Sequence, residues 1–169
     1  MSRQTGLNEK VYMKIKENNM VNFTKKHNNS SIPSKSHPSD SGYDLTATEM
    51  SVVLNDETGY ISYIAYDTGL SIDPPDDIYF LLYPRSSVRK YDLSLCNSVG
   101  VIDTSYRGNI IVCFTPTIPA KSINEITIYD VGDRIAQLIP QLLLDITFKE
   151  TSDIKNTDRG DGGFGSSGK

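Results

Sequence analysis

Short runs of Ile, Val, Leu and Tyr recur along the chain, and polar turn sequences separate them. Runs of this kind, rich in β-branched and aromatic residues and bounded by Gly, Pro and Asp, are typical of strands. Val11, Met13 and Ile15 alternate with polar residues and predict a first strand. The other predicted strands are residues 21–23, 61–65, 78–83, 109–115, 125–128, 135–139 and 142–148. We expect the last of these runs to close the hydrophobic core.

The expected fold class is all-β, because many short strands joined by regular turns are typical of a distorted β-barrel or jelly roll. One short helix, of one or two turns, is predicted at residues 86–91, directly after Pro84 and Arg85. We expect an N-terminal extension (1–20), a β-barrel domain (21–150), and a linker with a Gly-rich C-terminal arm (151–169).

Bulk composition excludes several classes of protein. The 169 residues suffice for one domain with a real core, and the net charge of −4 argues against a general nucleic-acid binder. Two cysteines, Cys96 and Cys113, are too few for a disulfide scaffold and predict reduced thiols in or near the core of an intracellular protein, cytoplasmic or nuclear. No apolar stretch is long enough to span a bilayer, so no membrane association is expected. His27 and His37 lie in polar sequence without metal-ligand spacing and are predicted to be surface histidines.

The last eleven residues read RGDGGFGSSGK. Glycines let backbone N–H groups approach a ligand closely, and Arg159 adds a fork of donors suited to phosphate. Phe164 offers a flat face on which a base can stack. The composition predicts a flexible phosphate cradle, and a disordered terminus remains the alternative.

Two clusters earlier in the chain carry polar groups next to strands. In Ser41-Gly-Tyr-Asp-Leu, Asp44 follows a glycine turn at the head of a strand. In Pro84-Arg-Ser-Ser, a guanidinium and two hydroxyls stand at the start of the predicted helix, where unpaired N–H groups favour anions. Taken alone, the first is compatible with a solvated turn and the second with simple helix capping.

Two further clusters follow. Residues 100–108, GVIDTSYRG, predict a β-hairpin whose tip presents Asp103 and Tyr106. Residues 132–138, GDRIAQL, predict a turn entering a strand, where Arg134 and Gln137 can donate hydrogen bonds.

Together with the tail, these clusters resemble in order the five motifs of the trimeric dUTP pyrophosphatases, the dUTPase family, over residues 21–169. The resemblance implies hydrolysis of dUTP to dUMP and pyrophosphate by water attack on the α-phosphate with Mg²⁺. That reaction keeps uracil out of DNA and supplies dUMP for thymidylate synthesis. It also implies a homotrimer whose sites are shared between subunits.

The resemblance assigns a role to each matching residue. Asp103 orients and deprotonates the attacking water, and Asp44 contacts Mg²⁺ through water while the triphosphate holds the ion. The residues that match phosphate-binding positions are Arg85, Ser86, Ser87, Gln137, Arg159, Gly163, Gly165, Ser166 and Ser167. Those that match uracil- and deoxyribose-binding positions are Asn97, Gly100, Val101, Ile102, Tyr106, Ile111 and Phe164. Ser87 stands where most members have Gly, and Ser105 where an acidic residue is frequent.

Two alternatives remain open. A dCTP deaminase of the same fold also carries Arg-Ser-Ser, matched here by residues 85–87. Arg107 stands where that enzyme has its catalytic Glu, and deaminases lack the Gly-rich tail with its Phe. A non-catalytic jelly-roll binding module is the other alternative, against which Asp103 and the tail both argue.

Overall fold

Short antiparallel strands build the body of the protein in this computed structural model, which describes residues 20–163. The strands are β1 (Asn22–Lys25), β2 (Tyr43–Thr46), β3 (Glu49–Leu54), β4 (Ile61–Asp67), β5 (Leu70–Asp73), β6 (Ile78–Pro84), β7 (Leu93–Leu95), β8 (Gly100–Ile102), β9 (Ile111–Pro116) and β10 (Arg134–Leu142). Two 3₁₀ helices, η1 (Ser86–Lys90) and η2 (Ile123–Glu125), interrupt them. Among the described residues, no helix has both the length and the apolar character needed to cross a bilayer.

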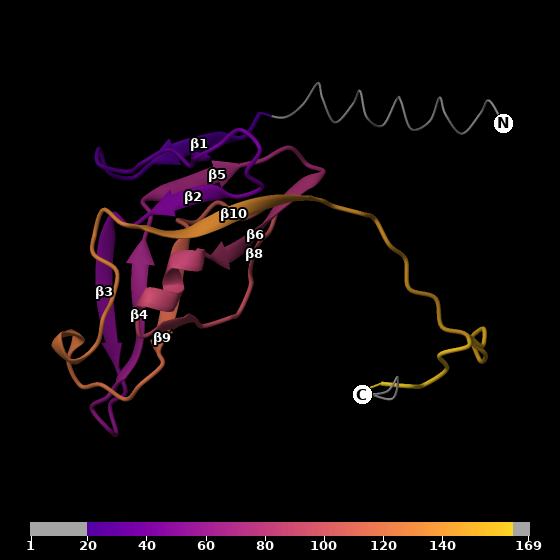
Figure 1. Cartoon of the computed structure of the whole chain (residues 1–169). Coiled ribbons are helices and arrows are strands. Elements are labelled where there is room, and N and C mark those ends of the chain that lie inside the picture. The colour runs from indigo at the N-terminus through magenta and orange to yellow at the C-terminus, as the bar shows by residue number, and fades with distance from the viewer. Residues whose placement is uncertain (1–19, 164–169) are drawn as a thin grey trace.

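Two four-stranded sheets enclose the core (Figure 1). One has the order β2-β10-β6-β8 and the other β3-β4-β9-β7, while β1 pairs with β5 in a two-stranded sheet. Leu45, Leu82 and Leu138 from the first sheet belong to the same buried cluster as Ile64 and Phe114 from the second. Two sheets that share one core give the jelly-roll architecture, so the all-β prediction is confirmed.

Aromatic packing anchors the core of the second sheet. Tyr66, Phe114 and Tyr129 are buried, and the Tyr66 ring meets the other two edge-on at centroid distances of 6.0 and 6.3 Å. The Tyr66 hydroxyl donates to the Tyr129 carbonyl at 2.9 Å, which satisfies its only polar group. Burial raises the pKa of Tyr66 far above its usual value, so the ring stays neutral at any ordinary pH.

Most predicted strands are present, with shifted ends. The predictions at residues 21–23, 61–65, 78–83, 109–115 and 135–139 correspond to β1, β4, β6, β9 and β10. The short helix is confirmed as η1. The predicted strand at residues 11–15 lies outside the described residues.

Three predictions are wrong. Residues 125–128 form no strand, because η2 ends at Glu125 and an extended loop follows. Residues 142–148 do not close the core: β10 ends at Leu142, and the apolar side chains beyond it are exposed, Phe148 to 95 %. Residues 100–108 form no hairpin, because β8 pairs with β6 in one sheet and β9 pairs with β4 and β7 in the other.

Candidate active site

Asp44 is shared by two arginines from other parts of the chain. Arg85 donates from Nε to Asp44 Oδ1 at 2.7 Å and from Nη2 to Oδ2 at 3.3 Å. Arg134 donates from Nη1 to Asp44 Oδ2 at 2.8 Å and to Ser36 Oγ at 2.9 Å. The Asp44 side chain is only 10 % exposed. Two guanidinium groups share one carboxylate, so some of their N–H groups remain free to donate to a bound anion.

Strand register brings these groups to one place. On β10, Gln137 lies directly opposite Asp44 of β2 on one side and Tyr83 of β6 on the other. Arg85 follows immediately after β6. The β2–β10 register shifts between Arg134 and Ala136, and such a bulge turns a side chain away from the regular alternation.

The amide of Gln137 is positioned by the absence of a side chain at Gly42. A Cβ on Gly42 would collide with Gln137 Oε1, and Gln137 Nε2 donates to the Pro84 carbonyl at 3.4 Å. The missing side chain at Gly42 therefore leaves room for the Gln137 amide, and the Pro84 carbonyl holds that amide at the cavity wall.

These residues line an open polar cavity of about 320 Å³. Its walls come from Ser36, Asp40, Ser41, Gly42, Asp44, Arg85, Ser86, Gln137 and Ile139. Ser86 is exposed in this wall. Ser87 turns away from it, since its hydroxyl lies 3.4 Å from the Tyr129 hydroxyl. Burial raises the pKa of Tyr129, so this partner is a neutral hydroxyl.

Asp103 lines a different cavity of about 770 Å³. It is exposed in the turn between β8 and β9, where its carbonyl accepts the Tyr106 N–H at 3.0 Å. The same turn is tied down by Thr104, whose hydroxyl donates to the Ile78 carbonyl at 2.9 Å. Arg107 donates to the Thr104 carbonyl at 2.6 Å and forms an ion pair with Asp73. These contacts therefore fix the backbone of the turn that carries the Asp103 carboxylate.

The predicted base- and sugar-binding residues flank this turn. Gly100 is buried in β8, where a Cβ would press on Leu82 and on Asn97 Nδ2 at 3.2 and 3.3 Å. Tyr106 folds back over Gly108, and its hydroxyl donates to the Asn109 carbonyl at 2.9 Å. Of the remaining members, Asn97, Val101 and Ile111 are exposed, and Ile102 is half-buried.

Within one chain the predicted site is thus divided. Asp44, Arg85, Ser86 and Gln137 share one cavity, and Asp103 lines another. The C-terminal segment runs away from the body (Figure 1), and within it Arg159 donates to the Gly162 carbonyl at 2.9 Å. Gly163 is exposed; the other predicted tail residues, Phe164, Gly165, Ser166 and Ser167, lie outside the described residues.

Asp44 can hold a metal ion only through a water molecule. Its two oxygens already accept three arginine N–H groups, and a carboxylate offers about four acceptor positions. The remaining position can accept one hydrogen bond from a water on a hydrated cation. Asp40 lines the same cavity and accepts the His37 backbone N–H at 2.8 Å, so it too is partly free.

One expectation about the histidines is wrong. His27 is half-buried, and its Nε2 lies 3.3 Å from Glu49 Oε1. Ligand atoms of His27, Glu49 and Asp67 lie within 4.8 Å of one another, a proximity that polar flanking sequence did not indicate. Asp67 is already occupied by Lys26, Asn109 and the Gly69 N–H, and these hydrogen bonds lower its pKa despite partial burial. The trio is a polar cluster that joins the loop after β1 to β3 and β4.

The sequence analysis assigned Arg134 a donor role but no place in the site, and it assigned no role to Ser36. The hydrogen bonds of Arg134 to Asp44 and to Ser36 join residues 90 and 98 positions apart in the chain, so no local pattern indicates them.

Comparison with known proteins gives concordant matches. A family model described as dUTPase matches residues 28–168. A deoxyuridine 5′-triphosphate nucleotidohydrolase of Rhodococcus erythropolis is 37 % identical over 138 residues, which cover 81 % of this chain and 79 % of that protein. One from Corynebacterium glutamicum is 37 % identical over 139 residues, covering 82 % and 87 %.

Solved structures agree on the fold. The dUTPase of Staphylococcus bacteriophage 80alpha with dUpNHpp has a TM-score of 0.66 at 24 % identity, covering 89 % of this chain and 99 % of that chain. A mutant dUTPase of phage phi11 of S. aureus, described with a coordinated structural Mg(II) ion, has a TM-score of 0.62 at 22 % identity, covering 80 % and 98 %.

Proposed function

The chain belongs to the dUTPase family, and we propose that it is a dUTP diphosphatase that hydrolyses dUTP to dUMP and pyrophosphate. The structural observation that carries this proposal is the polar cavity that Asp44, Arg85, Ser86 and Gln137 line, with Arg134 bound to the same Asp44 carboxylate. The guanidinium N–H groups that Asp44 leaves unused can donate to a small anionic substrate, although the chain as a whole has a net charge of −4.

Phosphate binding is assigned to Arg85, Ser86 and Gln137. Arg85 donates from Nε and Nη2 to Asp44 and from Nη1 to the Arg134 carbonyl at 3.4 Å, which leaves one hydrogen on each Nη for phosphate oxygens. Asp44 thereby orients the guanidinium before the substrate arrives, which lowers the entropy lost on binding. Ser87 contributes its backbone N–H, since its hydroxyl faces Tyr129.

Mg²⁺, when bound, neutralises phosphate charge and stabilises the charge that develops on the leaving pyrophosphate. Asp44 would hold the hydrated ion through one water, and the substrate's own phosphates would supply the direct ligands.

Asp103 is proposed as the general base. Its carboxylate accepts a proton from a water molecule while that water's oxygen bonds to the α-phosphorus. The bond from the α-phosphorus to the bridging oxygen breaks, and pyrophosphate leaves with the bonding electrons. The hydrogen bonds of Thr104 and Arg107 fix the turn whose backbone carries Asp103.

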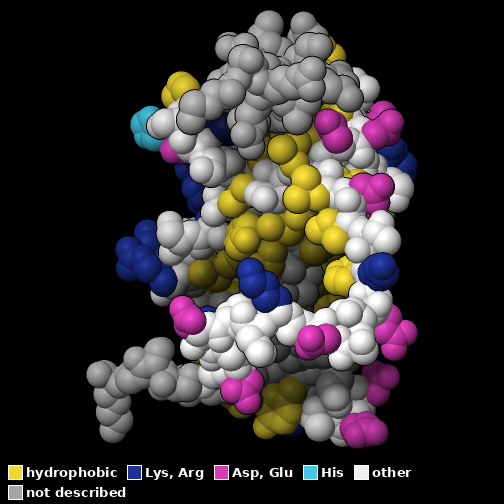
Figure 2. Space-filling view, turned by 90° about the vertical axis from the view of Figure 1, so that its right-hand side faces the viewer, with side chains coloured by type: hydrophobic (Ala, Val, Ile, Leu, Met, Phe, Trp, Pro, Cys, Tyr) yellow, Lys and Arg dark blue, Asp and Glu magenta, His cyan; other side chains and the backbone are white. Residues whose placement is uncertain are grey.

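The divided site supports a homotrimer in which each active site draws on several copies. Residues 142–148 extend from β10 with Leu142, Leu144, Ile146 and Phe148 exposed, although solvent is a poor environment for them. Hydrophobic side chains gather around a hollow on the face seen from the right of Figure 1 (Figure 2).

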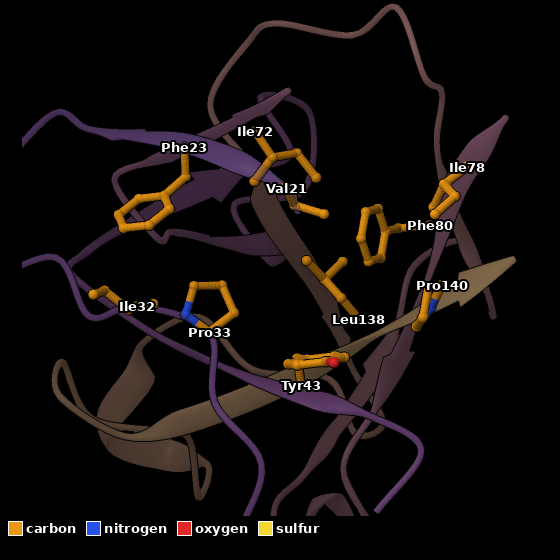
Figure 3. Close-up of a pocket in the computed structure, with 10 residues that line it drawn as sticks. All are labelled: Val21, Phe23, Ile32, Pro33, Tyr43, Ile72, Ile78, Phe80, Leu138 and Pro140. Atoms are coloured by element: carbon orange, nitrogen blue, oxygen red, sulfur yellow. The ribbon is translucent and has the colours of Figure 1, made fainter. Parts of the chain in front are cut away.

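An apolar groove of about 420 Å³ offers a place for residues 142–148 of another copy (Figure 3). Phe23, Tyr43, Phe80 and Leu138 are among its lining residues, and they point toward one another from β1, β2, β6 and β10. We assign this groove to residues 142–148 of a neighbouring copy. Light scattering should give three times the 18.8 kDa chain mass.

Base and sugar selection is assigned to the segment around β8. Asn97 and the backbone of Gly100, Val101 and Ile102, with the strand near Ile111, would pair with the uracil edge. Fixed partners for uracil leave cytosine with mismatched polar groups in a dry pocket, which is costly. The Tyr106 ring would occupy the space of a ribose 2′-hydroxyl. The tail, with Arg159 and Gly163, would close over the phosphates.

One assay separates the possible functions: pyrophosphate release from dUTP and ammonia release from dCTP, both with Mg²⁺. Pyrophosphate from dUTP is the expected result. Ammonia from dCTP would indicate the deaminase, although Arg107, which is engaged with Asp73, has no carboxylate to move a proton. Release of neither pyrophosphate nor ammonia would indicate a non-catalytic binding module.

A further inference from the structure

The two cysteines lie directly opposite each other on neighbouring strands. β7 and β9 pair Leu95 with Phe114, so the next pair in the antiparallel register is Cys96 with Cys113. The Cys96 N–H donates to the Cys113 carbonyl at 3.0 Å, which confirms that the register continues past the end of β7. Leu95 and Phe114 are buried, and successive side chains alternate between faces. Both cysteines therefore project from the same outer face.

Their spacing suits a covalent bond. Directly opposite residues in an antiparallel pair have Cα atoms about 5.5 Å apart when hydrogen-bonded, within the range of about 4.4–6.8 Å that disulfides span. The Cys96 thiol has only a weak contact, at 3.1 Å to the Thr115 hydroxyl, which lies on the same face. A rotation about one Cα–Cβ bond turns it from Thr115 toward Cys113.

We propose that Cys96 and Cys113 form a cross-strand dithiol that a small-molecule disulfide oxidises to an intramolecular disulfide beside the base-recognition segment. Sequence reasoning placed both thiols in or near the core, whereas Cys96 is exposed and Cys113 half-buried. The dithiol is thus an accessible modification site.

The chemistry proceeds in two exchanges. Cys96 is the attacking group because it is exposed, whereas burial raises the pKa of the Cys113 thiol and suppresses its thiolate. The Cys96 thiolate bonds to one sulfur of oxidised glutathione and expels the other as a thiolate. Cys113 then loses its proton and attacks the Cys96 sulfur, which releases the second glutathione thiolate. The two cysteines lose two electrons, and one glutathione disulfide becomes two thiols.

The disulfide would act on a tightly folded segment. Asn97 follows Cys96 directly, Ser98 N–H donates to the Leu95 carbonyl at 3.2 Å, and Ser98 adopts a φ of +59°, which non-glycine residues rarely do. A disulfide needs Cβ atoms about 3.8 Å apart, closer than the roughly 5 Å of an opposite pair. Closing it draws Cys96 toward β9 and displaces Asn97. This consequence rests on the proposed role of Asn97 in uracil binding.

The experiment titrates the full-length protein with increasing ratios of oxidised to reduced glutathione. Free thiols are counted, the linked peptide is mapped by mass spectrometry, and KM for dUTP is measured at each ratio. We expect both thiols to disappear together into one intramolecular link, KM to rise about tenfold as a base hydrogen bond is lost, and reductant to reverse both. Cys96→Ser should keep KM constant across the titration, and Cys113→Ser should stop at a glutathione adduct.

Distinct results would overturn the proposal. Free thiols at every ratio, a persistent adduct on Cys96 in the unsubstituted protein, or a link between chains would each eliminate the cross-strand dithiol. A disulfide that forms without changing KM would eliminate its coupling to base recognition. A reduced protein that fails to hydrolyse dUTP would contradict the proposed function, while the thiol count would still decide the dithiol.

Discussion

Arg85 holds both oxygens of Asp44, from Nε at 2.7 Å and from Nη2 at 3.3 Å. This two-point contact fixes the plane of the guanidinium, which one hydrogen bond alone would leave free to rotate. Since Arg134 binds the same carboxylate, Asp44 is the residue that holds both guanidinium groups in place.

Asp44→Asn should therefore weaken substrate binding although it removes a negative charge from an anion site. The amide cannot accept from both arginines at the same two oxygens, so the two guanidinium groups lose their common anchor. We expect KM for dUTP to rise about tenfold or more and unfolding free energy to fall by on the order of 3 kcal/mol, because the pair is largely buried. Steady-state kinetics and thermal unfolding measure both. Asp40→Asn, in the same cavity, is the matched control and should change neither much.

Asp103→Asn should abolish turnover and leave nucleotide affinity within about tenfold, because it removes the proton acceptor and keeps the phosphate contacts. Calorimetric titration with a non-hydrolysable dUTP analogue, beside single-turnover kinetics, separates the two effects. Asp76→Asn, another exposed carboxylate on the same cavity, serves as the control. If affinity and turnover fell by equal factors, Asp103 would be a structural residue.

Gly42→Ala should act through Gln137. The added Cβ meets the Gln137 side chain, which must swing away from the cavity wall. We expect kcat/KM to fall about tenfold, the value of one charge-assisted hydrogen bond. Gln137→Ala should cause a similar loss, and the double variant should lose little more, since both changes remove the same contact. Additive losses would show that Gly42 acts elsewhere.

Removal of residues 159–169 should strongly reduce the rate of dUTP hydrolysis with little change in Tm. The described part of this segment is exposed and lies off the body, so it contributes little to the core (Figure 1). Differential scanning calorimetry and the pyrophosphate assay test the two halves of this prediction. A fall in Tm of many degrees would make the tail part of the folded core instead.

Tyr106→Ala should raise hydrolysis of UTP relative to dUTP, because it opens the space assigned to the missing 2′-hydroxyl. Tyr106→Phe keeps the ring and removes only the hydrogen bond to the Asn109 carbonyl, so it should retain discrimination. The ratio of kcat/KM for the two nucleotides is the measurement. Unchanged discrimination in the alanine variant would rule out sugar selection by this ring.

Local sequence patterns predicted the strands and the short helix, which depend on residues close together in the chain. The alternation in β4, β6 and β9 reflects burial of every second side chain, and Pro84 followed by Arg85 marked the end of a strand and the start of η1. β3 was missed because as an edge strand it exposes most of its residues and shows little alternation.

Pairing between distant segments was not predictable in the same way. The glycines at 100 and 108 suggested a hairpin, yet nothing in residues 100–109 indicates that β8 pairs with β6 instead. The apolar run at 142–148 suggested a strand that closes the core, yet its apolar side chains are exposed, because a local apolar pattern does not specify which surface a segment packs against. The union of Asp44 with Arg134 depends on the β2–β10 register, which only the folded chain defines.

β10 begins with Arg134, which binds Asp44, and leads without interruption into the exposed apolar residues of 142–148. Because β10 pairs with β2 and β6 along its length, we expect a displacement of its last residues to alter the position of Arg134. In the homotrimer that we propose, dissociation at low concentration should therefore weaken nucleotide binding while the barrel itself remains folded, so that activity falls before any spectroscopic sign of unfolding appears.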